Sequence, residues 1–262
     1  MTTGPPRSKL DVRVSAVSGT IVVQGSVPAN VSEWHCRFAA PDPVALLGGA
    51  LAEVLRAHGV ALVGGVRRER TTPTRQTRVL AELATPVLEA LVPINAHSNN
   101  AVADQLFLAL GDAQFGRGDR EGGRQATSLA LERLGVPEDG FAQVDGSGLS
   151  RANRVSARQI TALVAGVLRQ GGRTAEAFLE SMAAPRADGT LDSRLAGLED
   201  RLRAKTGFIG GTSALSGVVD TEQGRRLAFS ILVEYPVHDG LNTSVWKPLQ
   251  DRICRLLASW RP

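Results

Sequence analysis

The sequence predicts an α+β fold in which helices precede an antiparallel sheet. Helical periodicity dominates from about residue 43 to residue 182, and a series of extended apolar runs begins only after residue 200. Short connections join these late runs, which favours a meander of neighbouring antiparallel strands. With 262 residues, the chain is long enough to bury a full hydrophobic core.

The first part of the chain is expected to contain a hairpin and one helix. Residues 1–10 are polar and are predicted to be a disordered tail, and alternating apolar residues between positions 10 and 27 predict two short strands. Asp42 and Pro43 are typical of an N-cap and a first helical residue, so a helix should run from there to His58-Gly59. A short strand is expected at residues 60–66, followed by an exposed crossing loop at residues 67–78.

The middle of the chain is expected to be helical, with a tight turn at Asp145-Gly146-Ser147-Gly148. The predicted helices are 86–91 broken by Pro93, 101–110 ended by Gly111, 124–134 ended by Gly135, one capped by Ser156 that extends to about Val167, and 174–182. The predicted strands are 202–208, 212–219 and 225–234, and a final helix covers about 245–260.

Composition excludes several classes of function. The net charge of +4 comes from scattered arginines and only one tyrosine is present, which argues against a nucleic-acid partner. No apolar run is long enough to span a membrane, and no His or Cys cluster has metal-ligand spacing. Cys36 and Cys254 are too far apart in sequence to be read as a disulfide framework or a zinc site, and their state stays open. We therefore expect neither a metal nor a nucleotide cofactor.

Lys205-Thr206-Gly207 begins an extended run and has the chemistry to bind a carboxylate. Lysine supplies a positive charge and threonine a hydroxyl, while glycine lacks the Cβ that would keep an extended ligand from lying along the strand. Ser98-Asn99-Asn100 stands at the start of a predicted helix, where it could simply cap free N–H groups. Alternatively, Ser98 and Asn100 present a hydroxyl that can relay a proton and an amide that can bind a substrate amide.

Together these triplets resemble the second and third motifs of the serine penicillin-binding proteins, whose signature is S-x-x-K, S-D-N and K-T-G. Further stretches in the same order resemble one branch, the PBP4-type D-alanyl-D-alanine carboxypeptidases and endopeptidases of peptidase family S13. They are residues 94–111, 145–153, 188–191, 203–207 and 213–217. Ala96 and Asp104 depart from the lysine and glutamate that are usual in the family, which bears on local packing more than on chemistry.

The resemblance implies a penicillin-binding, transpeptidase-like fold and a role for each motif residue. Ser98 would pass a proton towards the leaving amine, Asn100 would hold the substrate's peptide amide, and Lys205 would act electrostatically near the nucleophile. Thr206 would bind the terminal D-alanine carboxylate, and the strand at Gly207 would lie alongside the substrate. The partners implied for the complete enzyme are the peptidoglycan stem peptide and β-lactams, and its location would be extracytoplasmic.

The family's nucleophile, the serine of Ser-x-x-Lys, is expected well before the second motif. Lysines occur only at positions 9, 205 and 247, and the one match, Ser244-x-x-Lys247, opens the predicted C-terminal helix. We therefore expect a C-terminal part of a longer enzyme that holds the substrate-binding half without its nucleophile. Residues 11–40 would be a remnant of an inserted β-rich region, and 41–262 the catalytic domain, with a helical subdomain at about 86–182.

Two other interpretations stay open, and a third is disfavoured. The chain could be a non-catalytic peptidoglycan- or partner-binding pseudoenzyme, and as a complete product without a signal peptide it would stay in the cytoplasm. An esterase or β-lactamase that uses Ser244 is a further alternative. A Ser-His pair at His97-Ser98, oriented by His238-Asp239, is disfavoured because neighbours in sequence rarely point at each other.

Overall fold

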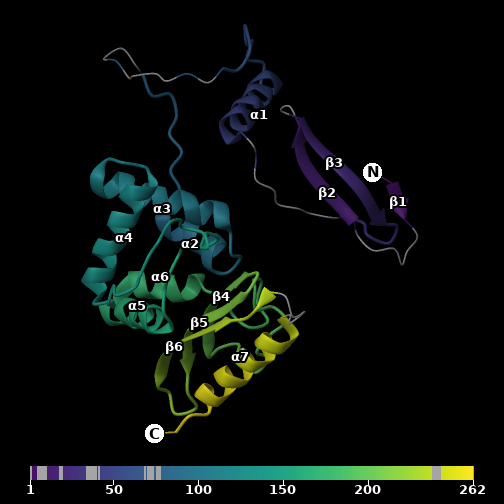
Figure 1. Cartoon of the computed structure of the whole chain (residues 1–262). Helices are drawn as coiled ribbons and strands as arrows, with labels where there is room; N and C mark the ends of the chain where they lie inside the picture. The colour runs from purple at the N-terminus through teal and green to yellow at the C-terminus, as the bar shows by residue number, and fades with distance from the viewer. Residues whose placement is uncertain are drawn as a thin grey trace. The chain divides into compact units, whose positions relative to one another are not determined.

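The structure is a computed structural model of the whole chain (Figure 1). It describes residues 2–4, 11–17, 20–33, 40, 42–67, 69, 74, 78–237 and 243–261. The chain separates into two compact units, residues 1–82 and residues 83–262. Both triplets singled out in the sequence lie in the second unit.

The first unit contains a three-stranded sheet and one helix. Strand β2 (Asp11–Val17) pairs antiparallel with β3 (Thr20–Pro28), which confirms the predicted hairpin. Within the expected disordered tail, residues 2–4 instead form β1 (Thr2–Gly4), because their backbone pairs parallel with β3. The Asp42 side chain accepts a hydrogen bond from Ala45 N at 3.0 Å and begins α1 (Pro43–Ala57), as predicted. The strand predicted at residues 60–66 is wrong: these residues are exposed and irregular, because no neighbouring strand pairs with them within the described part of the unit.

Five helices form the first half of the second unit. They are α2 (Val87–Asn95), α3 (Asn100–Phe115), α4 (Arg120–Leu134), α5 (Ala157–Gln170) and α6 (Gly172–Ser181). Ser156 caps α5 in a capping box with Gln159, and Gly135 ends α4 in the left-handed conformation at φ 69°, both as predicted. Asp119 caps α4, so this helix begins four residues before the predicted start.

Two predicted helix ends are wrong. Pro93 lies inside α2, which continues to Asn95, since a proline near the end of a helix removes few hydrogen bonds. Gly111 lies inside α3, which ends at Gly116 in the left-handed conformation. A Cβ on Gly111 would lie 2.5 Å from both Gly122 C and Gly123 N. This glycine therefore permits close packing of α3 on α4 and does not end a helix.

Replacing Gly111 by alanine is expected to destabilise the protein by about 1–3 kcal/mol, because the added methyl group would force two backbones apart. Thermal unfolding followed by circular dichroism measures the effect. The matched control is Gly49→Ala in α1, where a Cβ would meet nothing within 4 Å and the better helix propensity of alanine should be neutral or stabilising. Equal melting temperatures for Gly111→Ala and the unmodified protein would contradict the packing role.

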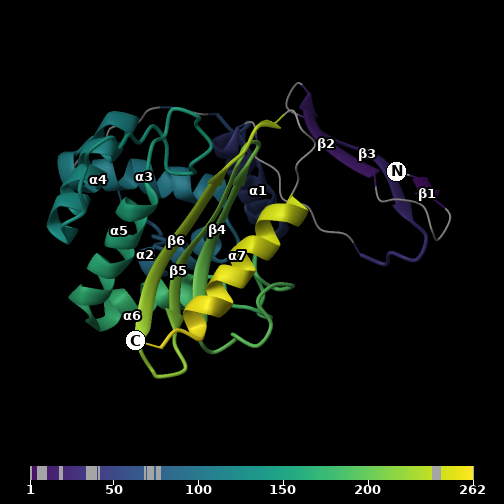
Figure 2. The same ribbon diagram turned by 60° about the horizontal axis from the view of Figure 1, so that its bottom comes forward.

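The second half of the unit is an antiparallel meander, as predicted. Strands β4 (Leu202–Ile209), β5 (Thr212–Asp220) and β6 (Arg226–Glu234) lie in the order β4-β5-β6, so β4 and β6 are its edges. Helix α7 (Thr243–Ala258) packs along one face of the sheet (Figure 2). Helix α5 contacts β5 and β6 of the sheet, and α2 contacts β4.

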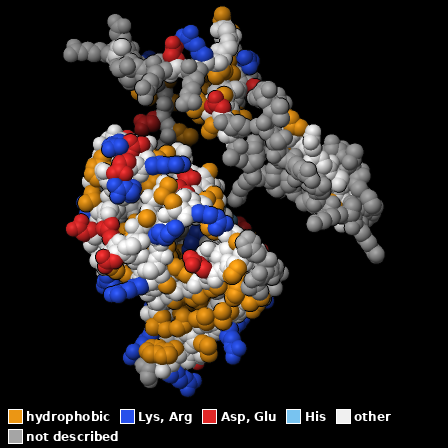
Figure 3. Space-filling model, viewed as in Figure 1, with side chains coloured by type: hydrophobic (Ala, Val, Ile, Leu, Met, Phe, Trp, Pro, Cys, Tyr) orange, Lys and Arg blue, Asp and Glu red, His pale blue; other side chains and the backbone are white. Residues whose placement is uncertain are grey.

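The core of this unit lies between the sheet and α7. Leu202, Ala204, Leu215 and Val219 are fully buried against Cys254 of α7. Hydrophobic side chains also form a band on the surface around the sheet (Figure 3), and Leu227 and Ile231 of β6 are only partly buried. Both side chains pack against the core cluster that contains Cys254 of α7.

Candidate active site

Ser98 lies immediately before α3 in an uncommon backbone conformation. Asn99 is the N-cap, and its side chain accepts a hydrogen bond from Val102 N at 3.2 Å. The capping role therefore belongs to Asn99, while Ser98 precedes the cap and Asn100 is the first residue of the helix. Ser98 has a φ of 55°, a left-handed conformation that is costly for serine and that is enriched at functional sites.

Lys205 reaches Ser98 across 107 residues of sequence. Its Nζ donates a hydrogen bond to Ser98 Oγ at 2.8 Å and a second one to the carbonyl oxygen of Thr206. The two triplets predicted to share a site are therefore brought together by this contact. Asn100 lies on the first turn of α3 with an exposed side chain.

Lys205 is half-buried, and burial lowers its pKa to about 8 because the charged form loses hydration. Burial is the cause of this shift, and no charged side chain of the described residues contributes to it. An ammonium group without a neutralising carboxylate gains stability from a bound anion. The site is therefore electrostatically suited to a carboxylate ligand.

The lowered pKa of Lys205 predicts a stability that depends on pH. Between about pH 8 and its unfolded value of 10.5, the unfolded state binds more protons than the folded state, so the free energy of unfolding should rise with pH. Chemical denaturation at pH 7.5 and pH 9.5 measures this rise. Lys205→Met should be more stable than the unmodified protein at pH 7.5, by on the order of 1–3 kcal/mol, and should lack the rise. A parallel rise in both proteins would contradict this origin.

Thr206 and Gly207 lie on the open edge of the sheet. Ala204 N donates a hydrogen bond to Ala183 O at 3.0 Å on the edge of β4 that faces away from β5. Because alternate residues of a strand direct their backbone groups to the same side, the N–H group of Thr206 also faces this edge. A Cβ on Gly207 would lie 3.2 Å from Ala214 Cβ. The outward-facing N–H group of Thr206 can therefore pair with an extended ligand that lies along β4 beyond Ala204.

A pocket of about 440 Å³ opens beside Thr206 and Gly207. Thr190, Arg194 and Lys247 also line it, and the Arg194 guanidinium is held by Asp251 at 2.6 Å. The buried Thr190 hydroxyl has no hydrogen-bond partner among the described residues. Thr190 is thus a candidate ligand-binding residue that sequence reasoning did not assign, although the Asp188-Gly189-Thr190 stretch was the available signal.

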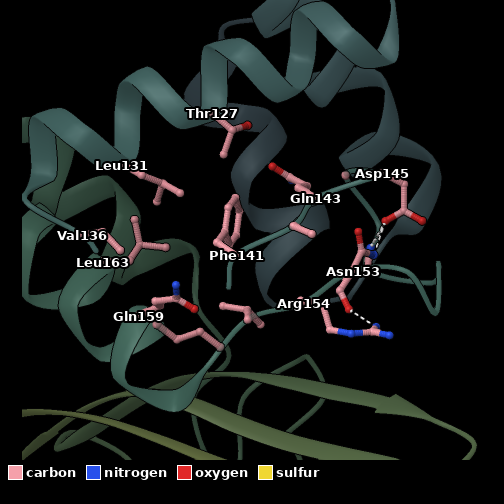
Figure 4. Close-up of a pocket in the computed structure, with 15 residues that line it drawn as sticks. Thr127, Leu131, Val136, Phe141, Gln143, Asp145, Asn153, Arg154, Gln159 and Leu163 are labelled. Atoms are coloured by element: carbon pink, nitrogen blue, oxygen red, sulfur yellow. Dashed lines mark hydrogen bonds between the residues drawn. The ribbon is translucent and has the colours of Figure 1, made fainter. Parts of the chain in front are cut away.

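The loop at residues 145–153 is held by hydrogen bonds, as Figure 4 shows for Asp145 and Asn153. Asp145 accepts hydrogen bonds from Gly148 N and Ser150 N, both at 2.8 Å, which confirms the predicted turn. Asp104 of α3 accepts from Gly146 N at 2.9 Å and from Ser147 N at 2.8 Å. Through these two hydrogen bonds, Asp104 holds the loop against α3, the helix that follows Ser98.

The same loop borders a mainly apolar pocket of about 250 Å³ between α4 and α5 (Figure 4). Its lining includes Leu131, Phe141, Ile160 and Leu163, and neither Ser98 nor Lys205 takes part. A reactive hydroxyl next to an amine with a lowered pKa is a stronger sign of chemistry than an apolar hollow. We therefore place the candidate active site at Ser98 and Lys205.

The remaining sequence candidates lie elsewhere or outside the described residues. His97 Nε2 lies 3.9 Å from Asp188 Oδ2, while Ser98 contacts Lys205, so the structure supports no His97–Ser98 pair. Helix α7 begins at Thr243, close to the predicted start, and the Ser244 side chain, His238-Asp239 and Cys36 lie outside the described residues. Cys254 is buried, which raises the pKa of its thiol to about 12.

Neither a metal site nor a membrane helix is found where the structure describes the chain. Among those residues, no group of three or more His, Cys, Asp or Glu side chains could hold a metal ion. None of the described helices has the length and apolarity required to cross a bilayer.

The fold and the site define a protein of the penicillin-binding, β-lactamase-like class. Penicillin-binding protein 4 (DacB) of Haemophilus influenzae, solved with a β-lactam, superposes with a TM-score of 0.74 at 21% identity, over 95% of this chain and 59% of that one. A β-lactamase from Chitinophaga pinensis superposes with a TM-score of 0.50 over 66% of this chain and 64% of its own. At these identities the likeness establishes the fold alone.

The chain belongs to the D-Ala-D-Ala carboxypeptidase 3 (S13) family, whose profile matches residues 2–258. The D-alanyl-D-alanine carboxypeptidase of Actinomadura sp. (strain R39) is 35% identical over 254 residues, which cover 93% of this chain and 45% of that protein. Carboxypeptidase DacB of Mycolicibacterium smegmatis is 27% identical over 86% of this chain and 54% of its own length. The chain therefore spans about half the length of these relatives.

Proposed function

We propose that this chain is the substrate-binding part of a serine D-Ala-D-Ala carboxypeptidase or endopeptidase that acts on peptidoglycan stem peptides outside the cytoplasm. The observation that carries the proposal is the contact of Lys205 with Ser98 at the open edge of β4, where no described carboxylate neutralises the lysine. The family to which the chain belongs supports the same reaction.

The D-Ala-D-Ala end of the peptide would lie along the edge of β4 beside Thr206 and Gly207, with the outward-facing N–H group of Thr206 available for pairing. Its terminal carboxylate would be held by the Thr206 hydroxyl and the Lys205 charge, since charge-assisted hydrogen bonds are stronger than neutral ones. Thr190 lines the adjoining pocket with an unused hydroxyl and would add a donor there. Ser98 would pass the proton to the leaving D-alanine, and Asn100 would hold the peptide amide.

The reaction itself would be acyl transfer to a serine, followed by hydrolysis of the acyl-enzyme. In this proposal, the acylated serine is that of a Ser-x-x-Lys motif that the 262 residues do not supply at the expected place. β-Lactams would occupy the same site, as the complex of the Haemophilus influenzae relative with a β-lactam supports.

Isothermal titration calorimetry with a peptide ending in D-Ala-D-Ala tests the binding half of the proposal. The peptide with a free carboxylate should bind, whereas the same peptide with a C-terminal amide or ending in L-Ala-L-Ala should bind at least tenfold more weakly. Equal affinity for the acid and the amide would exclude carboxylate recognition at Lys205, and equal affinity for the L-Ala-L-Ala peptide would exclude recognition of the D configuration. Mass spectrometry after incubation with penicillin tests the other half, since a stable penicilloyl adduct on the chain would show that it carries its own acylated serine.

A further inference from the structure

Ser98 and Lys205 also meet the requirements of a nucleophile and its base. We propose that this pair is a catalytic centre in its own right, in which Ser98 is acylated by small activated esters that lack a carboxylate and Lys205 takes the serine proton. This activity goes beyond the proposed function, where Ser98 only relays a proton.

The geometry of Ser98 supports attack by its hydroxyl. A serine nucleophile requires a base within about 2.6–3.2 Å, and Lys205 Nζ lies 2.8 Å from Ser98 Oγ. Asn99 carries the capping hydrogen bond of α3, which leaves the Ser98 hydroxyl outside that role. The left-handed backbone at Ser98, with φ 55°, is an outlier that neither helix capping nor a glycine explains.

Lys205 must lose its proton before it can act as a base. Half-burial lowers its pKa to about 8, so a neutral amine is available at mildly alkaline pH. His97, the titratable residue next to Ser98 in sequence, does not replace Lys205 as the base, because its Nε2 lies 3.9 Å from the exposed carboxylate of Asp188. On the neighbouring strands, Ser216 is the register partner of Lys205, and its Oγ is hydrogen-bonded to Ser230 Oγ at 2.8 Å. The hydroxyl groups of Ser216 and Ser230 are both neutral.

The reaction balances with water as the only co-reactant. Ser98 Oγ forms a bond to the ester carbonyl carbon while its proton moves to neutral Lys205, and the bond to the leaving alkoxide or phenoxide then breaks. Lysine returns the proton to solvent or to the leaving group. Water then attacks the acyl-serine, Lys205 takes the water proton, and Ser98 leaves as its hydroxyl, which releases the carboxylic acid.

The open edge of β4 offers a donor for the developing oxyanion. The Thr206 N–H group faces the same edge as the Ala204 N–H group that bonds Ala183, and the Thr206 carbonyl already contacts Lys205 Nζ. This donor therefore lies one residue from the base. Preorganised backbone donors of this kind stabilise tetrahedral intermediates.

Lys205 also explains why substrates with a carboxylate would not acylate Ser98. A carboxylate bound to Lys205 stabilises the ammonium form and raises its pKa, so the amine cannot accept the serine proton. The same lysine thus binds a carboxylate or activates Ser98, but does not do both. A peptide ending in D-Ala-D-Ala should accordingly inhibit ester hydrolysis.

The test is hydrolysis of p-nitrophenyl acetate by the 262-residue protein, combined with peptide mapping by mass spectrometry. We expect p-nitrophenolate release at least tenfold above that of Ser98→Ala, an acetyl group on the peptide that contains Ser98, and a rate that rises about tenfold from pH 7 to pH 9 as Lys205 deprotonates. Lys205→Met should lose both the acetylation and this rise, whereas Ser259→Ala and Arg133→Met, at exposed positions elsewhere in the chain, should keep them.

Circular dichroism establishes that each variant is folded, and Ser98→Cys, which retains a nucleophile, should acquire the acetyl group at the same position. An acetyl group on Lys205 with Ser98 unmodified, or an unchanged rate in Ser98→Ala, would overturn the inference. Calorimetric binding of the peptide is measured separately. A protein that binds the peptide but lacks the esterase activity contradicts only this inference, and the reverse result contradicts only carboxylate binding.

Discussion

Replacing Lys205 by methionine is expected to weaken binding of a peptide ending in D-Ala-D-Ala by about 10- to 150-fold. A hydrogen bond to a charged group contributes about 1.5–3 kcal/mol, and each 1.4 kcal/mol is a tenfold change in affinity. Methionine keeps much of the length of the side chain and removes the charge and the donors. Calorimetry at pH 7 measures the loss.

The matched control is Arg133→Met, which removes one positive charge from an exposed position near the end of α4. It should leave the affinity unchanged, because exposed distant charges are largely screened. The affinity of the unmodified protein should also fall as pH rises above about 8, where Lys205 loses its proton, and should vary little below that value. A Lys205→Met protein that binds as tightly as the unmodified one would place the carboxylate elsewhere.

The site could be predicted from the sequence at the level of its motifs but not of its contacts. Lys205-Thr206-Gly207 and Ser98-x-Asn100 were found because their residue types carry recognisable chemistry at short spacing. The hydrogen bond between Lys205 and Ser98 depends on how the helices pack against the sheet, which no local pattern specifies. The stretch that contains Thr190 could be recognised, but the role of Thr190 could not, because only the fold places its hydroxyl beside the pocket.

The fold was predictable wherever local signals agreed with packing. The meander β4-β5-β6 and the caps at Asp42 and Ser156 follow from residue types that act over a few positions. The glycine at position 111 does not end a helix, and the apolar run at residues 60–66 does not form a strand. Both depend on neighbours far along the chain, since Gly111 is required by its contact with α4 and a strand requires a partner.

The assignment of residues 11–40 as a remnant of an inserted β-rich region, and of residues 41–262 as the catalytic domain, stays a prediction. The family profile matches residues 2–258, and the chain covers 45% and 54% of the length of the two relatives, which establishes the family but not these boundaries.

Replacing Gly217 by alanine is expected to destabilise the second unit strongly. Gly217 is the register partner of Ala204 on β4, directly beside Lys205, and a Cβ at this position would lie 2.1 Å from Arg203 O and 2.6 Å from Ala204 Cα. Ala204 is fully buried, so neither strand can move without disturbing the core against α7. We expect a loss of about 3 kcal/mol, or about 6–12 °C in Tm.

Gly210→Ala is the control, because it adds the same methyl group at the β4–β5 connection, where the nearest atom, Arg151 Nη2, lies at an ordinary distance of 3.5 Å. Its free energy of unfolding should change by no more than about 0.5 kcal/mol, so its Tm should hardly change. If Gly217→Ala folds, it should also bind the D-Ala-D-Ala peptide more weakly, since separation of β4 from β5 moves Lys205 away from Ser98. Unchanged stability together with unchanged binding would show that β4 is not held in place by this close contact, and the site would then need another source of rigidity.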